Sequence, residues 1–212
     1  MPNKRAELFP SLQITADQLI HEFDQIGEDR RKLLRELSNL VREKLIANQS
    51  ASLNFICTHN SRRSHIAQLW AQTAAHYFNI PNVECFSGGT EATAFNPRAV
   101  KAMQDVGFHI SKMKDGDNPR YEVLFSSEAP PVISFSKKYD DPFNPVKNFA
   151  AVMTCSHADE NCPMVLGASK RIDITYDDPK NFDGTSQEAE KYSERTQEIG
   201  REILFVFSRI KV

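Results

Sequence analysis

From residue 53 onward the chain alternates short apolar runs with amphipathic stretches. The apolar runs predict strands at 53–58, 83–89, 149–155 and 171–176, and the amphipathic stretches predict helices at 64–78, 96–107 and 186–209. Such alternation favours a parallel sheet, because parallel neighbours need a crossover connection. We therefore expect an α/β protein, a doubly wound parallel sheet flanked by helices on both faces. Ligands of such sheets bind at the carboxyl ends of the strands.

A helical segment precedes this alternation. Over residues 16–47 apolar side chains recur at three-to-four spacing on a charged background, which predicts helix with Thr15 as its N-cap. Gly27 makes two helices as plausible as one. A polar linker follows, so we expect an N-terminal helical extension at 1–51 and a second domain at 52–212. The apolar stripe of the extension must be covered by the second domain or by another copy in a homodimer.

An insertion interrupts the second domain. Residues 121–126 and 132–136 have the pattern of two strands, and the Ser-Glu-Ala-Pro-Pro segment between them is typical of a turn. The surrounding sequence is rich in Pro and Asp and breaks the strand-helix alternation. We place this insertion near 114–146.

Composition limits the classes of partner. The chain has 26 basic and 28 acidic residues and a net charge of -2, so no global field favours nucleic acid or an anionic membrane. The basic cluster Arg30-Arg31-Lys32 with Arg35 stands among acidic residues and is interpreted as a solvated helix face. The first residues lack the apolar core of a secretory signal, and no apolar run reaches the roughly 20 residues of a membrane span. We expect a soluble, cytoplasmic protein with no nucleic-acid and no membrane partner.

The segment CTHNSRRS, residues 57–64, joins the first predicted strand of the second domain to its first helix. Backbone N–H groups and the helix dipole make such a junction an anion site. The same dipole and Arg63 would favour the Cys57 thiolate, a nucleophile. Arg63 could place two hydrogen bonds on the anion, and Ser64 could donate to the sulfur. The alternative is a buried Cys57 with no chemical role, but positive charge at a helix N-terminus is unfavourable unless an anion binds there.

The pattern C-x-x-N-x-x-R-S resembles that of the low-molecular-weight protein-tyrosine phosphatases and of the thioredoxin-coupled arsenate reductases, which share a fold. Cys57, Asn60, Arg63 and Ser64 match it, and the resemblance covers roughly 52–209. It implies an oxyanion-binding loop made of Cys57, Thr58, His59, Asn60, Ser61, Arg62 and Arg63. Asn60 would hold the unusual backbone of this loop, because Asn tolerates the left-handed conformation.

The chain departs from the family in and near the loop. His59 stands where the family usually has Gly, and Arg62 where it often has Cys. Some related reductases bind potassium near the loop. Asn60 and Ser87 match that site, whereas Gln68 replaces a Glu, which argues against a cation. We predict no metal site and no cofactor.

The segment CSHADENCP, residues 155–163, matches the arsenate reductase pattern C-S-x-A-D-x-N-C-P and favours that branch. The resemblance implies a relay in which Cys57 attacks arsenate and Cys155 then attacks the Cys57 sulfur, so that arsenite leaves. Cys162 finally attacks Cys155, leaving a disulfide for thioredoxin. Cys155 and Cys162 stand about two helical turns apart, so we expect a mobile loop that brings the sulfurs within bonding range.

Other interpretations of these cysteines stay open. Cys155 and Cys162 lack the close spacing of common zinc motifs, although His157 and His59 could contribute ligands. A structural role for the pair would suit a phosphatase that has kept ancestral residues. Cys85 has no partner in the motif and is expected to be a core thiol.

Both reactions need a proton donor for the departing oxygen. Two Asp-Asp-Pro segments compete for this role. The resemblance places the acid just before the last helix, which selects Asp178, with Asp177 as the second choice, and leaves Asp141 to close the inserted hairpin. Asp-Asp-Pro also begins ordinary turns. The phosphatases usually have an aromatic residue just after this acid, where the chain has Lys180-Asn181.

Three functions are compatible with these motifs. The first is an arsenate reductase that needs all three motif cysteines and thioredoxin as reductant. The second is a low-molecular-weight phosphatase that hydrolyses phosphomonoesters through a Cys57 phosphoenzyme, with Arg63 and Asp178. The third is a non-catalytic oxyanion-binding or partner-binding protein, in which His59 has distorted the loop and removed its catalytic activity. The cysteine pattern favours the first.

Overall fold

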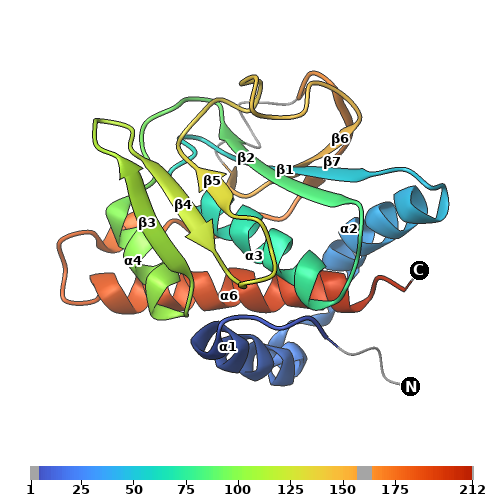
Figure 1. Ribbon diagram of the computed structural model, residues 1–212, viewed down its shortest axis with the longest axis horizontal. Coiled ribbons are helices and arrows are strands. Elements are labelled where there is room, and N and C mark those ends of the chain that lie inside the picture. The colour runs from blue at the N-terminus through green and yellow to red at the C-terminus, as the bar shows by residue number, and fades with distance from the viewer. Residues whose placement is uncertain (1–4, 157–163, 212) are drawn as a thin grey trace.

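The computed structural model of the chain describes residues 5–156 and 164–211. A parallel sheet of four strands, in the order β2-β1-β6-β7, lies at its centre (Figure 1). The strands are β1 (Ala51–Cys57), β2 (Val83–Gly89), β6 (Phe149–Met153) and β7 (Ala168–Asp173). Every neighbouring pair is parallel. The predicted α/β class with a parallel sheet and flanking helices is therefore confirmed.

The helices of the described residues are α1 (Pro10–His21), α2 (Glu28–Ile46), α3 (Arg63–Tyr77), α4 (Pro97–Asp105) and α6 (Glu188–Ser208). Short 3-10 turns lie at Phe23–Gln25 and Pro179–Phe182. Figure 1 shows α3 and α6 beneath the sheet, with α1 on the far side of α6. The α3, α4 and α6 helices lie close to their predicted positions. The helices α4 and α6 are amphipathic and α4 begins with Pro, whereas α3 is buried on nearly every side.

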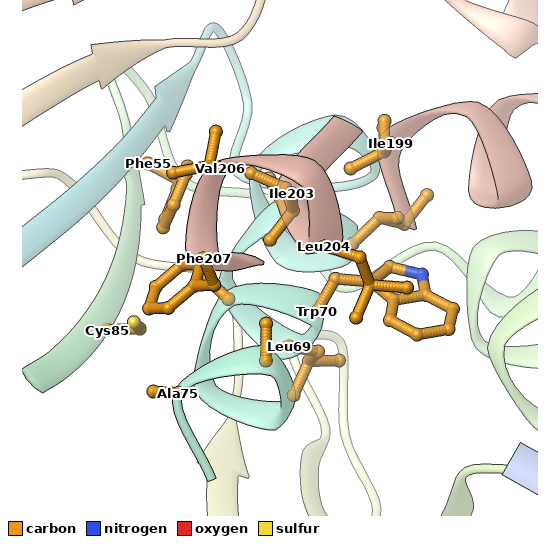
Figure 2. Packing of buried hydrophobic residues seen from close by; sticks show 14 of the residues in the cluster. Phe55, Leu69, Trp70, Ala75, Cys85, Ile199, Ile203, Leu204, Val206 and Phe207 are labelled. Atoms are coloured by element: carbon orange, nitrogen blue, oxygen red, sulfur yellow. The ribbon is translucent and has the colours of Figure 1, made fainter. Parts of the chain in front are cut away.

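The main core lies between α3, α6 and the sheet. Figure 2 shows Leu204 and Phe207 of α6 directed at α3, with Phe55 and Cys85 supplied by the strands. Trp70 of α3 is fully buried. No side chain fits at position 200 of α6, because a Cβ atom there would lie 2.6 Å from the Trp70 ring. Glycine therefore lets the two helices approach closely.

The opposite face of the sheet carries a second, smaller apolar cluster. Its buried members are Ile56, Cys57, Phe149, Ala151, Met153, Cys155 and Val165. Tyr139 packs against this cluster from the insertion. Two of the motif cysteines thus share one cluster at the carboxyl ends of β1 and β6.

The N-terminal extension forms two helices, α1 and α2. The predicted N-cap at Thr15 is wrong, because α1 begins at Pro10 and Thr15 lies inside it, where its hydroxyl donates to the Ser11 carbonyl at 3.2 Å. Pro at the first helical position is a start signal that the periodicity overlooked. Gly27 is the N-cap of α2 and separates it from the preceding 3-10 turn.

The apolar stripe of the extension is covered within one chain. Its residues belong to the same core cluster as α3 and α6, and Leu12, Leu34, Leu37 and Val41 are fully buried. Polar contacts fix the same interface, since the Ser38 hydroxyl donates to the Val206 carbonyl at 2.9 Å. A homodimer is therefore not required to cover this stripe.

The basic cluster of α2 is only partly a solvated face. Arg30 differs from the prediction, because its guanidinium donates to both carboxylate oxygens of the buried Glu202, at 2.9 and 2.8 Å, and lies over the Tyr176 ring. Lys32 and Arg35 pair with exposed acidic residues of the same helix, as expected. Arg30 instead ties α2 to α6.

A second, antiparallel sheet of three strands consists of β3 (His109–Lys114), β4 (Arg120–Leu124) and β5 (Val132–Ser134). The strand β3 precedes the insertion predicted near 114–146, and β4 and β5 lie within it. The predicted pair, β4 and β5, is confirmed. The strand β3 was not predicted, because it is mostly exposed and lysine-rich and so lacks an apolar strand pattern. Similarly, β7 begins ahead of its predicted start, because polar residues occupy its exposed first half.

No helix in the described part of the chain is long and apolar enough to cross a membrane.

Candidate active site

The loop between β1 and α3 lies at the carboxyl edge of the sheet, as predicted. Cys57 is the last residue of β1 and Arg63 is the first of α3. The neighbouring strand ends at Gly89, which is the register partner of Cys57. A Cβ atom at Gly89 would lie 2.7 Å from both the Asn60 nitrogen and the Thr58 carbonyl oxygen. Glycine is required there because β2 approaches the loop backbone so closely.

Cys57 is bonded to the start of the helix through Ser64. The two atoms Cys57 Sγ and Ser64 Oγ are 3.1 Å apart, and both residues are buried. Asn60 Nδ2 donates to Ser64 Oγ at 2.9 Å. Because Ser64 Oγ accepts from Asn60, its own proton can point at the sulfur. A hydroxyl that donates to sulfur stabilises the thiolate over the thiol.

Asn60 is the structural centre of the loop. Its φ is +44°, the left-handed conformation expected at this position. Its Oδ1 accepts from the Lys137 backbone N–H at 2.9 Å, so both ends of the amide are used. The insertion therefore supports the loop through a hydrogen bond to the Asn60 side chain. This contact was not predicted from the sequence, because a backbone donor in an insertion carries no residue signal.

The insertion also holds the carbonyl group of His59, which accepts from the Ser136 hydroxyl at 2.9 Å. The imidazole of His59 is half exposed, and its Nε2 lies 3.4 Å from Glu91 Oε2. The side chain thus points out of the loop toward the β2 side. Replacing the usual Gly by His leaves the loop formed.

Arg63 and Asp178 meet at the mouth of the loop. Arg63 Nη2 donates to Asp178 Oδ2 at 2.7 Å, and Nη1 donates to the Tyr176 carbonyl at 2.9 Å. The Nε of Arg63 is buried with no hydrogen-bond partner in the described part of the chain, so one donor is left for a bound anion. Asp178 also caps the turn that follows it, since its Oδ1 accepts from Lys180 N.

The other candidate acids contact groups outside the loop. Asp177 has a fully exposed side chain that pairs with Arg195 at 3.7 Å. Asp141 accepts from the Phe143 backbone in a turn. The geometry therefore favours Asp178 over Asp177 as the residue nearest Arg63.

Arg62 belongs to a second polar cluster beside the loop. Its Nε donates to the Tyr192 hydroxyl at 2.9 Å, and Tyr192 in turn donates to Asp183 at 2.9 Å. Burial and the bond to Asp183 raise the pKa of Tyr192 to about 12. Tyr192 was not predicted as a neighbour of the loop, because it lies in the closing helix with no motif around it.

Cys155 reaches the same loop from β6. Its Sγ lies 3.5 Å from the Thr58 hydroxyl, and the side chain is fully buried. The parallel pairing of β1 with β6 explains this, because it places the ends of both strands side by side. Cys162, together with the loop rearrangement expected around it, lies outside the described residues. Cys85 is buried in the core, and burial raises the pKa of its thiol.

The residues compared with a potassium site have other partners. Gln68 Nε2 donates to the Cys85 carbonyl at 3.0 Å, and Asn60 Oδ1 is used by Lys137. The Ser87 hydroxyl lies 3.3 Å from His65 Nδ1. Within residues 5–156 and 164–211, no three His, Cys, Asp or Glu side chains gather as a metal site would require.

The site thus combines a buried cysteine bonded to a serine, an arginine with a spare donor and a neighbouring carboxylate, a set of groups that suits attack by a thiolate on a tetrahedral oxyanion. The fold is one that solved structures share. A low-molecular-weight phosphotyrosine phosphatase from Vibrio cholerae superposes with a TM-score of 0.51 at 15% identity, covering 75% of this chain and 95% of that one.

Curated relatives narrow the class. The chain is 31% identical to the arsenate reductase of Bacillus licheniformis over 153 residues, which are 72% of this chain and 91% of that protein. It is 32% identical to the arsenate reductase of Bacillus subtilis over 150 residues, 70% and 89% of the two chains. No sequence model of a protein family matches the chain. The chain belongs to the arsenate reductase family.

Proposed function

We propose that this protein reduces arsenate to arsenite through a relay of three thiols, with thioredoxin as the final reductant. The observation that carries the proposal is the position of Cys155, whose Sγ lies 3.5 Å from the hydroxyl of a loop residue and in the same buried cluster as Cys57. A phosphatase needs a single thiol. A reductase needs a second one beside the first.

The first step is nucleophilic attack. Arsenate sits on the loop N–H groups and on Arg63, whose Nε is available for it. The Cys57 thiolate forms a bond to arsenic, and an arsenate oxygen leaves as water after Asp178 protonates it. The bound anion and Asp178 then compete for the Arg63 guanidinium. This competition weakens the pairing of Arg63 with Asp178.

The second step moves the electrons. The Cys155 thiolate attacks the Cys57 sulfur, a sulfur-sulfur bond forms, and the electron pair of the sulfur-arsenic bond stays on arsenic. Arsenic is thereby reduced by two electrons and leaves as arsenite, while two thiols become a disulfide. The Thr58 hydroxyl lies 3.5 Å from the Cys155 sulfur, a contact that holds this sulfur beside the loop.

The third step regenerates Cys57. Cys162 attacks Cys155 and leaves a Cys155–Cys162 disulfide, which thioredoxin reduces by ordinary exchange. The thioredoxin system of a reducing cytoplasm would supply the electrons, and we propose that location for the protein.

The test is arsenate-dependent NADPH oxidation with purified thioredoxin and thioredoxin reductase. Cys57→Ser, Cys155→Ser and Cys162→Ser should each abolish turnover. Cys85→Ala is the matched control, since Cys85 lies in the core away from the loop, and it should keep most of the activity. Turnover that survives loss of Cys155 or Cys162 would contradict the relay.

A phosphatase is the second candidate function, because the same loop and the Arg63–Asp178 pair suit a phosphomonoester. It would hydrolyse para-nitrophenyl phosphate with Cys57 alone. Hydrolysis that needs Cys57 but neither Cys155 nor Cys162, together with no arsenate turnover, would favour this function over the reductase.

A further inference from the structure

A groove lies between the two sheets, away from the oxyanion loop. It is bordered by α3, by the edge strand β2 and by the segment that contains β5, and its volume is about 480 Å³. Most of its walls are apolar, with Ile80, Val83, Phe125, Val132, Phe135 and Phe143 among them. Grooves of this volume and character bind small organic molecules in many proteins.

Two nearly buried polar side chains line this groove. Lys137 is only 5% exposed, and among the described residues its ammonium group makes neither an ion pair nor a hydrogen bond, while it lies 4.8 Å from the centre of the Phe135 ring. Gln68 is 4% exposed, and its Oε1 is buried with no hydrogen-bond donor in the described part of the chain. A buried acceptor without a donor is costly, so Gln68 Oε1 indicates a ligand that supplies a donor, and the Lys137 ammonium can pair with an anionic group of the same ligand.

The charges around the groove select the kind of ligand. Lys137 is the cationic residue that lines the groove, whereas Arg120 lies over the same Phe135 ring at 4.5 Å without lining it. Glu84 adds a negative charge at the exposed side of β2. A single ammonium balances the one negative charge of a carboxylate but only half the charge of a phosphate dianion, and an unbalanced charge is costly to bury.

We propose that this groove binds a small carboxylate with an aromatic body, at a site separate from the oxyanion loop. The carboxylate pairs with the Lys137 ammonium, the aromatic body lies against Phe135 and the apolar walls, and an N–H donor of the ligand meets Gln68 Oε1. Neither Lys137 nor Gln68 has an assigned role in the relay of thiols.

The groove is nevertheless linked to the loop. The backbone N–H of Lys137 donates to Asn60 Oδ1 at 2.9 Å, and its carbonyl accepts from Gly89 at 2.9 Å. Ligand binding at the Lys137 side chain is therefore expected to shift the amide resonances of Lys137, Cys85 and Asn60 together.

The test is titration of the full chain with indole-3-acetate, followed by amide NMR and calorimetry. We expect saturable binding, weakened about tenfold or more by Lys137→Met and retained by Lys137→Arg, because the ligand contact is ionic. Indole-3-acetamide, which lacks the charge, should bind about tenfold more weakly for the same reason. Ala129→Trp, which fills the groove from its partly buried wall, should abolish binding while leaving arsenate turnover unchanged.

Three results would overturn the proposal. The first is no binding at concentrations up to about 10 mM, weaker than sites of this kind normally show. The second is equal affinity for the acid and the amide. The third is displacement of indole-3-acetate by inorganic phosphate, which would place it in the oxyanion loop. The amide resonances of each variant without ligand are compared with those of the wild type. Resonances that are unchanged outside the groove show that the variant is folded.

Discussion

The hydroxyl of Thr58 lies 3.5 Å from the sulfur of Cys155, so the loop that carries Cys57 touches the second cysteine directly. The two residues are 97 positions apart in sequence and are brought together by the pairing of β1 with β6. This contact links the two halves of the proposed chemistry. The first thiol receives the oxyanion, and the second removes it as arsenite.

Thr58→Val tests this contact, because Val keeps the shape of Thr and removes the hydroxyl. Loss of the hydrogen bond that holds the Cys155 sulfur beside the loop should slow disulfide formation about threefold to tenfold. Alkylation of Cys57 by iodoacetamide should not change, since Ser64 and not Thr58 bonds to its sulfur. Rapid-quench measurement of arsenite release checks the first statement, and alkylation kinetics check the second. An unchanged release rate would show that Thr58 has no part in this step.

Ser64→Ala removes the hydroxyl that can donate to Cys57 at 3.1 Å. A hydrogen bond to a charged group contributes about 1.5–3 kcal/mol, so its loss should make the Cys57 sulfur a less reactive nucleophile. We expect alkylation of Cys57 by iodoacetamide at pH 7 to slow about tenfold or more. Cys85→Ala serves as the control for background alkylation. An alkylation rate equal to that of the wild type would contradict the assignment.

Asp178→Asn and Asp177→Asn form a matched pair. Asp178 contacts Arg63 at 2.7 Å, whereas Asp177 is exposed and meets Arg195. Loss of a general acid typically costs about 10²–10⁴-fold in rate, so Asp178→Asn should lose activity on that scale and Asp177→Asn should stay near the wild type. Steady-state kcat for arsenate distinguishes them. The reverse order would identify Asp177 as the acid.

Lys137 gives the fold a pH-dependent stability. Burial lowers the pKa of its ammonium from 10.5 to about 8, although Asp141 opposes the shift. Between these two values the unfolded chain binds more protons than the folded one, so this residue makes the free energy of unfolding rise with pH. Below about pH 8 its full cost, about 3 kcal/mol, is present. The nearby His65 carries a pKa well below its usual value, from burial and from the charge of Lys137.

Lys137→Met removes this cost. The variant should be more stable than the wild type at pH 7, by up to about 3 kcal/mol, and the difference should shrink as the pH rises from 8 to 10.5. Urea unfolding of both proteins at several pH values measures this. A constant difference across that range would show that Lys137 does not titrate as described.

The local parts of the site could be predicted from sequence, because they follow from short spacings. The strand that ends at Cys57 and the helix that begins at Arg63 fix the loop between them. Asp178, the predicted acid, contacts Arg63 at 2.7 Å, while its role as an acid stays a prediction. These features depend on residues whose side chains themselves make the contact.

Other features could not be predicted, because they depend on backbone groups or on distant packing. The Lys137 N–H that supports Asn60 belongs to an insertion and would be a donor with almost any residue there. Arg30 has the sequence context of a surface charge, and only the packing of α6 brings Glu202 beside it. The unpaired Lys137 ammonium is equally invisible in sequence, since only the tertiary structure buries it.

The central claim is that Cys57 and Cys155 react with each other after arsenate binds. The most direct measurement is peptide mapping by mass spectrometry of the Cys162→Ser variant after a single turnover with arsenate and no thioredoxin. The account predicts one Cys57–Cys155 disulfide and one arsenite released per chain. Free Cys155 with no arsenite, or a disulfide that involves Cys85, would contradict it.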